Sequence, residues 1–363
     1  MSSEAASATP GGNPPVSLVV LTWNGKHLLE ECFPSVVAAA GRYSGETELI
    51  VVDNGSTDGS VEFIRERFPK VCLISLRTNT GFQVGSNTGV KAAKHGLVFL
   101  LNNDILLDAD CIAPLARHFT NEKLFAVGPL MLFPCSSVAI YSCSGVRFSR
   151  GELLEEWAIS NGVDLCGRVS PTLYLSGGAM MFQKQIFEEL GFFDALYNPF
   201  SCEDLDICYR AWKMGYYMLY EPASIVYHKH SATIPKVFSR RYYDFIMRRN
   251  KFILMWRNIT GCRYLVEHLT FLVPRIIRRW MNGNTLEIDA FLMALLRVPR
   301  IVARRLREKK GYVRSDAEIC GMLSIENLLS PGLMFEIGAG GIEFKDRSHI
   351  HETESERNGV LPK

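Results

Sequence analysis

The sequence predicts an α/β fold, in which a mostly parallel β-sheet carries helices on both faces and a helical extension follows it. Short runs of branched apolar residues alternate with segments of helical spacing, beginning with Val16–Leu21 and residues 28–33. Leu97–Leu101 is apolar throughout, which is typical of a strand buried on both faces, and it is too short to span a membrane. Strands that alternate with helices imply right-handed crossovers and parallel pairing.

The individual elements follow from apolar periodicity and from turn or cap residues. Asp108-Ala109-Asp110 spells Asp-x-Asp, but a helical pattern follows it, so we favour Asp108 or Asp110 as an N-cap over a metal ligand. The expected elements are a strand at Val16–Leu21 and a helix from residue 28, a strand at Glu48–Val52 and a helix capped by Thr57 or Asp58 that runs to Phe68, a strand at Val71–Leu76 and a helix at Phe82–Lys94, the strand from Leu97, a helix through Ile112–Phe119, a strand at Leu124–Leu130, antiparallel strands within Val138–Glu156, a helix that opens at Ser201, and two strands at Tyr216–Tyr220 and Ala223–Tyr227.

Length and composition bound the organisation of the chain. Its 363 residues are 47% hydrophobic, enough for a packed core in one large or two modest domains, and its net charge of +2 indicates no nucleic-acid partner. The ten cysteines form no CxxC pair, which favours a reducing cytoplasm over a disulfide framework or a zinc site. We expect a disordered lead-in at residues 1–15 that is not a signal peptide, a main domain at 16–235, a basic amphipathic helical region at 236–312, and a partly disordered tail at 313–363.

Polar residues follow four of the predicted strands. Thr22-Trp23-Asn24, Asp53, residues 77–81 and Asn102–Asp104 all lie just after a strand, so parallel packing would place them on one rim of the sheet, where such folds bind ligands. Turns are polar in any case. An aromatic such as Trp23 beside an acid such as Asp53, however, suits a nucleobase that needs stacking and edge hydrogen bonds.

The triplet Asn102-Asn103-Asp104 ends the buried strand abruptly. Our working hypothesis is that Asp104 offers a carboxylate oxygen to Mg²⁺ or Mn²⁺, a hard cation that keeps several waters and takes its other ligands from substrate phosphates. The alternative is an Asn/Asp turn that simply closes a strand.

Three acids, Glu203, Asp204 and Asp206, open the helix near Ser201. The helix dipole favours acids at this end, and Ser201 with Asp204 resembles a capping box. Capping explains one acid. Three acids in four residues favour a carboxylate at the lip of a cleft that acts as a general base, its proton affinity raised by its neighbours.

Two further features are candidates for the lining of the same cleft. Gly177 and Gly178 either let the backbone approach a ligand closely or form a tight β-bend. His228 follows a predicted strand and either completes a metal site, contacts a phosphate, or is structural.

The chain from Arg240 to about residue 312 consists of basic helical segments without about 18 uninterrupted apolar residues, so we predict no transmembrane helix. Such helices either lie on an anionic bilayer or pack against the main domain with their arginines in water. Residues 336–341 look like the glycine-rich loop of a methyltransferase, but too little chain follows to build that fold. We expect disorder from Lys345 onward.

Residues 16 to about 230 resemble the family 2 inverting glycosyltransferases of the GT-A fold, in the rhamnosyltransferase-like branch. The resemblance is carried by VSLVVLTWNG, LIVVDNGSTDGS, NTGFQVGSNTG, VFLLNND, LSGGAMMF, and EDLDICYRAWKMGY followed by the strand before His228. One position departs from the family: Asn102 stands where many members carry the first Asp of an Asp-x-Asp motif, which leaves Asp104 as the metal ligand.

The resemblance also implies residue roles. The nucleotide would be bound by Thr22, Trp23, Asn24, Asp53, Arg77, Asn79, Gly81 and Asn103; Mg²⁺ or Mn²⁺ would be held by Asp104 and His228; Asp204 would be the catalytic base, with Glu203 beside it; and Gly177, Gly178 and Asp206 would lie in the sugar and acceptor region.

The function expected is inverting transfer of a sugar from a dTDP- or UDP-linked donor to a hydroxyl of a glycan or a lipid-linked acceptor, in the cytoplasm or at the inner face of the plasma membrane. One alternative is a catalytically inactive scaffold that binds nucleotide-sugars. The other is a sugar nucleotidyltransferase, which usually shows a glycine- and arginine-rich loop near the first strand; TWNGKHLL is not such a loop.

Overall fold

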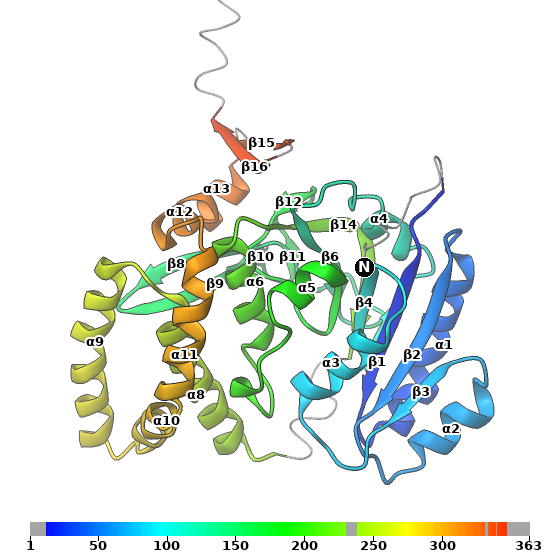
Figure 1. Ribbon diagram of the computed structural model, residues 1–363, viewed down its shortest axis with the longest axis horizontal. Helices are drawn as coiled ribbons and strands as arrows, with labels where there is room; N and C mark the ends of the chain where they lie inside the picture. Colours follow the sequence, from blue (N-terminus) through cyan, green and yellow to red (C-terminus); the bar gives the residue numbers. More distant parts are fainter. Residues whose placement is uncertain (1–11, 230–237, 331–332, 339, 347–363) are drawn as a thin grey trace, which may run out of the picture.

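A mixed β-sheet forms the centre of the computed structural model, which describes residues 12–229, 238–330, 333–338 and 340–346. Among these residues the sheet has ten strands, in the order β12-β14-β6-β13-β4-β1-β2-β3, with β5 paired to β14 and β7 to β6 (Figure 1). Its strands are β1 (Val16–Thr22), β2 (Thr47–Asp53), β3 (Cys72–Ser75), β4 (Leu97–Asn102), β5 (Ile105–Leu107), β6 (Leu124–Leu132), β7 (Ala139–Tyr141), β12 (Ser170–Pro171), β13 (Ala179–Gln183) and β14 (Tyr217–His228).

The parallel part of the sheet brings the predicted rim together. Strand β1 pairs in parallel with β2 and β4, and β2 pairs in parallel with β3. The register places Thr22 opposite Asp53 and Leu21 opposite Asn102. The polar turns that follow these strands therefore leave the sheet at one edge, as predicted. Strand β13 is antiparallel to both β4 and β6, so the sheet is mostly rather than wholly parallel.

Helices cover the sheet because its central strands are apolar on both faces. Every residue of β1 is buried. Helix α3 packs on one face so closely that a Cβ at Gly85 or Gly89 would collide with Leu21 or Val19. The helices of this domain are α1 (Lys26–Arg42), α2 (Ser60–Arg67), α3 (Phe82–Ala92), α4 (Ile112–Ala116), α5 (Lys184–Glu189), the 3₁₀ turn η1 (Ala195–Tyr197) and α6 (Glu203–Lys213).

Three hairpins and a set of C-terminal helices complete the described part of the fold, and α8, α9, α10 and α11 lie beyond one end of the sheet (Figure 1). No helix among the described residues is long and apolar enough to cross a bilayer. The elements are the hairpins β8 (Ser144–Ser149) with β9 (Glu152–Trp157), β10 (Ile159–Ser160) with β11 (Val163–Asp164), and β15 (Leu333–Gly338) with β16 (Gly341–Asp346), and the helices α8 (Arg240–Asn258), α9 (Cys262–Met281), α10 (Leu286–Leu295), α11 (Val298–Glu308), α12 (Asp316–Met322) and α13 (Ile325–Leu329), with a 3₁₀ turn η2 (Lys309–Gly311).

Four local predictions were wrong. Helix α2 has Gly59 as its N-cap, not Thr57 or Asp58, and no side chain caps it. Helix α4 has Cys111 as its N-cap; Asp108 Oδ1 instead accepts a hydrogen bond from Asp110 N, and Asp110 forms a surface ion pair with Arg42. The predicted strands at 216–220 and 223–227 are one strand, β14, because an irregularity in its pairing with β6 between Glu221 and Ile225 absorbs the polar break.

The fourth concerns the capping box at Ser201. Helix α6 starts after two residues of positive φ, Ser201 and Cys202, and no side chain caps it, so the box is absent.

The two ends of the chain are described only in part. Residues 1–11 and 347–363, where disorder was predicted, lie outside the described residues. Lys345 and Asp346, where the disordered end was expected to begin, belong to strand β16. The glycine-rich stretch at 336–341 spans the turn of the β15–β16 hairpin, which agrees with setting aside a methyltransferase loop.

Candidate functional site

The turns that follow β1 and β2 are joined by Asn24. Its backbone has a left-handed φ of 46°, its N–H donates to Ser56 Oγ at 2.8 Å, and its Oδ1 accepts from Thr57 N at 2.8 Å. Trp23, half-buried, lies between this junction and Thr22. The side chain of Asn24 therefore fixes the position of Trp23 at the rim.

Asp53 ends β2 and is almost completely buried. Its Oδ2 accepts from Ser56 N at 3.2 Å and from Ser75 Oγ at 3.3 Å. Its Oδ1 accepts no hydrogen bond from the described residues. Because buried polar atoms are normally paired, this oxygen is suited to an N–H or O–H of a ligand.

The loop after β3 is shaped by Asn54, which the sequence reasoning missed. Asn54 is 3% exposed. Its Nδ2 donates to Asn79 Oδ1 and Gly81 O, and its Oδ1 accepts from the N–H and hydroxyl of Thr80. Asn79 and Gly81 thus hold the loop rather than reach outward, while Arg77 is exposed. An Asn directly after a strand-ending Asp, with a Gly-containing turn to follow, was the available signal.

Replacement of Asn54 by alanine should leave these loop groups unpaired. We expect a free energy of unfolding lower by about 1–3 kcal/mol and a several-fold higher KM for the donor, because the loop that carries Arg77 loses its support. Chemical denaturation and donor-saturation kinetics measure the two effects. Asn327→Ala, a surface substitution in α13, is the matched control and should leave KM unchanged. An unaltered KM in Asn54→Ala would show that the loop after β3 does not contribute to donor binding.

Asp104 and His228 meet at the rim because β5 pairs with the end of β14. His228 stands opposite Ile105 in that pairing, and Lys229 N donates to the carbonyl of Asp104. The distance from His228 Nε2 to Asp104 Oδ1 is 3.2 Å, and both side chains are largely buried. Asn103 turns away from them and donates from Nδ2 to Thr22 Oγ1 at 2.9 Å.

This pair fits a divalent cation that is only partly held by protein. Asp104 Oδ1 accepts no hydrogen bond from the described residues, and the imidazole lies beside it. Across the described part of the chain, no group of three or more His, Cys, Asp or Glu side chains could hold a metal ion. A cation here would therefore take most of its ligands from water or from a bound diphosphate, the usual situation for Mg²⁺.

Gly177 and Gly178 connect this corner to Asp204. Asn102 N donates to Gly178 O at 2.9 Å, and a Cβ at Gly178 would lie 3.2 Å from Asn102 Nδ2. Gly177 N donates to Asp204 Oδ2 at 3.1 Å. The two glycines therefore bridge the triplet that ends in Asp104 and the first turn of α6.

Asp204 and Glu203 are carboxylates with raised proton affinity. Burial raises the pKa of Asp204, and the charge of Glu155 adds to the rise, against hydrogen bonds from the Gly177 and Leu205 backbones. Burial and the neighbouring Asp204 raise the pKa of Glu203, which accepts a hydrogen bond from Gln83 Nε2 at 2.9 Å. Glu203 is thus held in the interior, and Asp204 is the half-buried acid of the pair.

An aromatic cluster made by Tyr141, Trp157 and Tyr174 lies beside these acids and was not foreseen. Its ring centroids are 4.8 Å and 5.1 Å apart along the series. Burial raises the pKa of Tyr141 to about 12, and the charges of Asp204 and Asp104 contribute to the rise. The charges of both carboxylates therefore contribute to the raised pKa of this one phenol. Three aromatics dispersed over residues 141–174 gave no periodic signal in the sequence.

The structure corrects the expectation for Asp206. Its side chain is completely buried, and its carboxylate accepts hydrogen bonds from Tyr197, Arg210, Arg257 and Asn258. Helix periodicity explains the error, because Asp206 lies two residues after Asp204 and so points to the opposite side of α6. Asp206 cannot contact an acceptor sugar.

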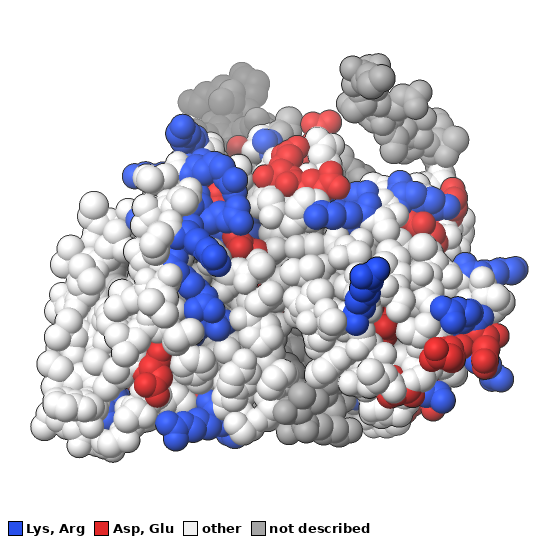
Figure 2. Space-filling view, turned by 60° about the horizontal axis from the view of Figure 1, so that its bottom comes forward, with Lys and Arg blue, Asp and Glu red and all other residues white. Residues whose placement is uncertain are grey.

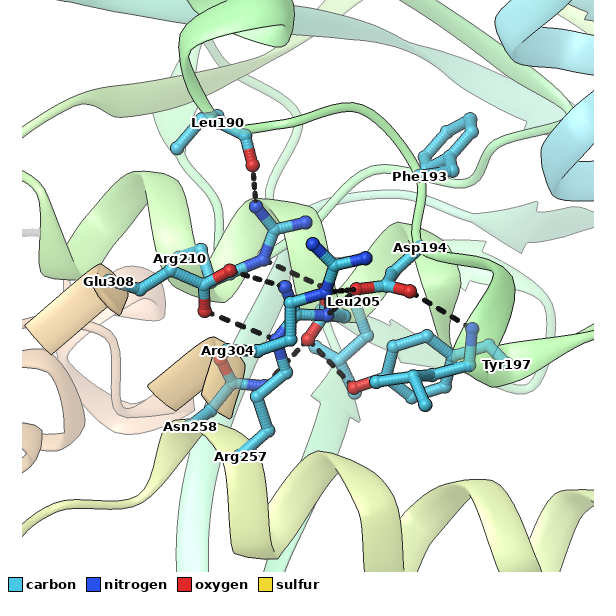
Figure 3. A network of polar contacts seen from close by, with 12 residues as sticks. Leu190, Phe193, Asp194, Tyr197, Leu205, Arg210, Arg257, Asn258, Arg304 and Glu308 are labelled. Carbon is cyan, nitrogen blue, oxygen red and sulfur yellow. Dashed lines mark hydrogen bonds and ion pairs between the residues drawn. The ribbon is translucent and has the colours of Figure 1, made fainter. Parts of the chain in front are cut away.

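Asp206 instead belongs to a buried ionic network that joins α6 to the C-terminal helices. Figure 3 shows side chains of α6, α8, α11 and the segment around Asp194 converging on one another. Arg257 of α8 pairs with Asp194 at 3.1 Å and with Glu308 of α11 at 2.6 Å. Arg304 of α11 pairs with Asp194 at 3.0 Å. Arg257 of the helical region is therefore buried in ion pairs rather than left in water, whereas Arg304 stays partly exposed.

Asp53, the Asp104–His228 pair and the loop after β3 thus lie at one edge of the sheet, and the glycine bridge links that edge to Asp204 at the start of α6. The fold is that of the GT-A proteins. Residues 17–191 match the family model described as Glycosyl transferase family 2. This stretch thus matches family 2 glycosyltransferases, and the relatives of the chain include rhamnosyltransferases.

Three known proteins illustrate the similarity. The N-acetylglucosaminyl-diphospho-decaprenol L-rhamnosyltransferase of Mycobacterium tuberculosis is 27% identical over 239 residues, which cover 60% of this chain and 76% of that protein. Chondroitin synthase of Pasteurella multocida is 22% identical over 241 residues, which cover 59% of this chain but only 24% of that protein. The structure of GalNAc-T7 with UDP, GalNAc and Mn²⁺ aligns with a TM-score of 0.52 and 16% identity over 68% of this chain and 48% of that chain, a likeness of fold.

Proposed function

We propose that the protein transfers a sugar, with inversion, from a dTDP- or UDP-linked donor to a hydroxyl of a glycan or lipid-linked acceptor. The observation that carries the proposal is the glycine bridge between the Asp104–His228 corner and Asp204. A binding scaffold has no need of a buried base. The rhamnosyltransferase relative supports transfer to a lipid-linked acceptor.

Donor binding is assigned to the rim of β1–β4. The unpaired Oδ1 of Asp53 would accept from the base, Trp23 would stack on it, and the exposed Arg77 would contact a phosphate. Thr22, Asn24, Asn79, Gly81 and Asn103 act indirectly in this proposal, since their hydrogen bonds hold the turns in place.

The donor diphosphate is assigned to the corner of Asp104 and His228. These two residues would hold Mg²⁺ or Mn²⁺, which supplies charge stabilisation for a departing nucleoside diphosphate. The GalNAc-T7 structure, which contains Mn²⁺, supports a divalent ion in this fold.

Asp204 is the base in this proposal. As the acceptor oxygen attacks the anomeric carbon from the face opposite the leaving group, its proton passes to Asp204, and the bond from that carbon to the diphosphate oxygen breaks. The raised pKa of Asp204 suits a group that must both take and release a proton near neutral pH. Tyr141, Trp157 and Tyr174 would provide a wall for the acceptor sugar.

A panel of nucleotide-sugars, assayed with and without EDTA for release of nucleoside diphosphate and for labelled glycan product, tests the proposal. We expect release with one donor, abolished by EDTA and restored by Mg²⁺ or Mn²⁺. Binding without release would indicate an inactive scaffold. Release of pyrophosphate from a nucleoside triphosphate and a sugar phosphate would indicate a nucleotidyltransferase.

A further inference from the structure

The outer face of helix α9 is apolar, the reverse of an ordinary surface helix. Val266, Leu269, Val273, Ile277 and Trp280 recur at spacings of three and four residues, so they form one stripe. All five are exposed, Leu269 by 61% and Trp280 by 65%. A surface helix normally turns its polar face to water.

The inner face of α9 is accounted for by other contacts. His268 and Leu272 are its buried residues. The His268 ring bonds to Gly151 O at 2.6 Å, and Glu267 Oε1 accepts from Gly151 N, so this face docks on the turn of the β8–β9 hairpin. The apolar stripe is therefore left over after the helix has packed, and it is not part of the core.

The surface continues onto the next two helices. Figure 1 places α9 at the edge of the molecule with α10 beside its end, and the left end of Figure 2 is an almost uncharged expanse next to a column of Lys and Arg side chains. We call this surface the apolar face. On α9 it consists of the stripe Val266, Leu269, Val273, Ile277 and Trp280. The neighbouring helices also expose large apolar side chains, namely Leu292, Met293, Leu295 and Leu296 at α10 and Val302 and Leu306 of α11.

Positive charge borders the apolar face (Figure 2). Between residues 262 and 310 the sequence has eleven Lys and Arg against four Asp and Glu. Arg263, Arg278, Arg279, Arg300 and Arg307 are exposed, and none of them forms an ion pair with another described residue. A second copy of this chain would bring the same positive rim against itself. Anionic lipid headgroups would neutralise it.

We propose that the apolar face docks on an anionic lipid bilayer, with the α9 stripe in the headgroup and acyl boundary and the arginines at the phosphates. Trp280 at the end of the stripe suits this depth, since tryptophan favours the membrane interface. A basic helix with a continuous apolar face lies on a bilayer without crossing it.

The position of this face also bears on the proposed function, on which this step rests. Helix α8 connects the two: Arg249 and Asn250 bond the carbonyls of Asn198 and Ser201, just before the acids of α6. The same helix packs against α10 and α11. Docking through the apolar face would hold the transfer site at a fixed height above the membrane, as a lipid-linked acceptor requires.

Co-sedimentation of the full chain with phosphatidylcholine vesicles, with and without phosphatidylglycerol, tests the docking in the absence of any substrate. We expect binding only to the anionic vesicles. The double variant Leu269→Gln/Val273→Gln should bind at least about tenfold more weakly, and Arg278→Gln/Arg279→Gln about fivefold more weakly for each charge, with a smaller salt dependence.

Val163→Gln is the matched control, because Val163 is equally exposed on the β10–β11 hairpin, and it should bind like the wild type. Absence of wild-type binding to anionic vesicles would overturn the proposal. So would a dimer in sedimentation velocity that the Leu269→Gln/Val273→Gln variant dissociates without any vesicle binding. The assay contains no donor, so absence of vesicle binding would refute the membrane docking alone. Sugar transfer to a water-soluble acceptor would remain possible, and the two proposals are therefore tested separately.

Discussion

Replacement of Asp204 by asparagine should slow sugar transfer at least about 100-fold, the usual contribution of a positioned base. The amide keeps the shape of the side chain and its contact with Gly177 N, but it cannot take the acceptor proton. Donor affinity should stay close to that of the wild type, because no donor contact is assigned to Asp204. Single-turnover transfer and donor titration measure the two quantities.

Asp110→Asn is the control for this experiment. Asp110 closes the literal Asp-x-Asp sequence, yet it pairs with Arg42 on the surface, so its replacement should leave transfer unchanged. In the wild type, transfer should fall on the acid side at a pH above the ordinary range of an aspartate, because burial raises the pKa of Asp204. Near-normal turnover of Asp204→Asn would remove this residue from the role of base.

Replacement of Arg257 by methionine should lower the free energy of unfolding by about 3–5 kcal/mol, because it leaves the buried carboxylates of Asp206 and Asp194 short of a partner. Transfer should fall as well, since Asp206 anchors the helix that carries Asp204. Denaturant unfolding gives the first effect. Arg307→Met, on the exposed side of α11, is the control and should change stability by no more than about 0.5 kcal/mol.

The same network predicts how stability varies with pH. Burial by itself would raise the pKa of Asp206, but Arg210 and Arg257 lower it below its ordinary value. Ionised Asp206 therefore stabilises the fold above the pKa that this carboxyl has in the unfolded chain. The stabilisation is lost as the pH falls through the folded-state pKa, and Arg257→Met should show a weaker dependence in that acid range. An equal dependence in both proteins would place the acid-sensitive group elsewhere.

The sequence was sufficient for the rim of the sheet because strand periodicity and strand order are local properties. Buried runs such as Leu97–Leu101 predicted both the strand and the polar turn after it, and parallel pairing then brought Asp53 and Asp104 to one edge. The pairing of Asp104 with His228 depends on β5 meeting β14, a contact between distant segments that only the motif order of the family suggested.

The wrong or missing predictions concern features that depend on contacts between segments far apart in the sequence. Three acids in four residues looked like a single catalytic group, but the helix turns Asp206 toward Arg210 and Arg257 while Asp204 faces Gly177. The capping box failed because the chain enters α6 through two residues of positive φ. The aromatic cluster of Tyr141, Trp157 and Tyr174 is assembled by hairpins and long-range packing, and no spacing rule brings those residues together.

The most direct test of the central claim is the affinity for nucleoside diphosphate, measured by calorimetry with and without Mn²⁺ for the wild type, Asp104→Asn and Asp204→Asn. We expect Asp104→Asn to lose the part of the affinity that depends on Mn²⁺, and Asp204→Asn to bind like the wild type but to transfer sugar at least about 100-fold more slowly. Wild-type affinity with Mn²⁺ in Asp104→Asn, together with undiminished transfer by Asp204→Asn, would contradict a shared site between these two acids.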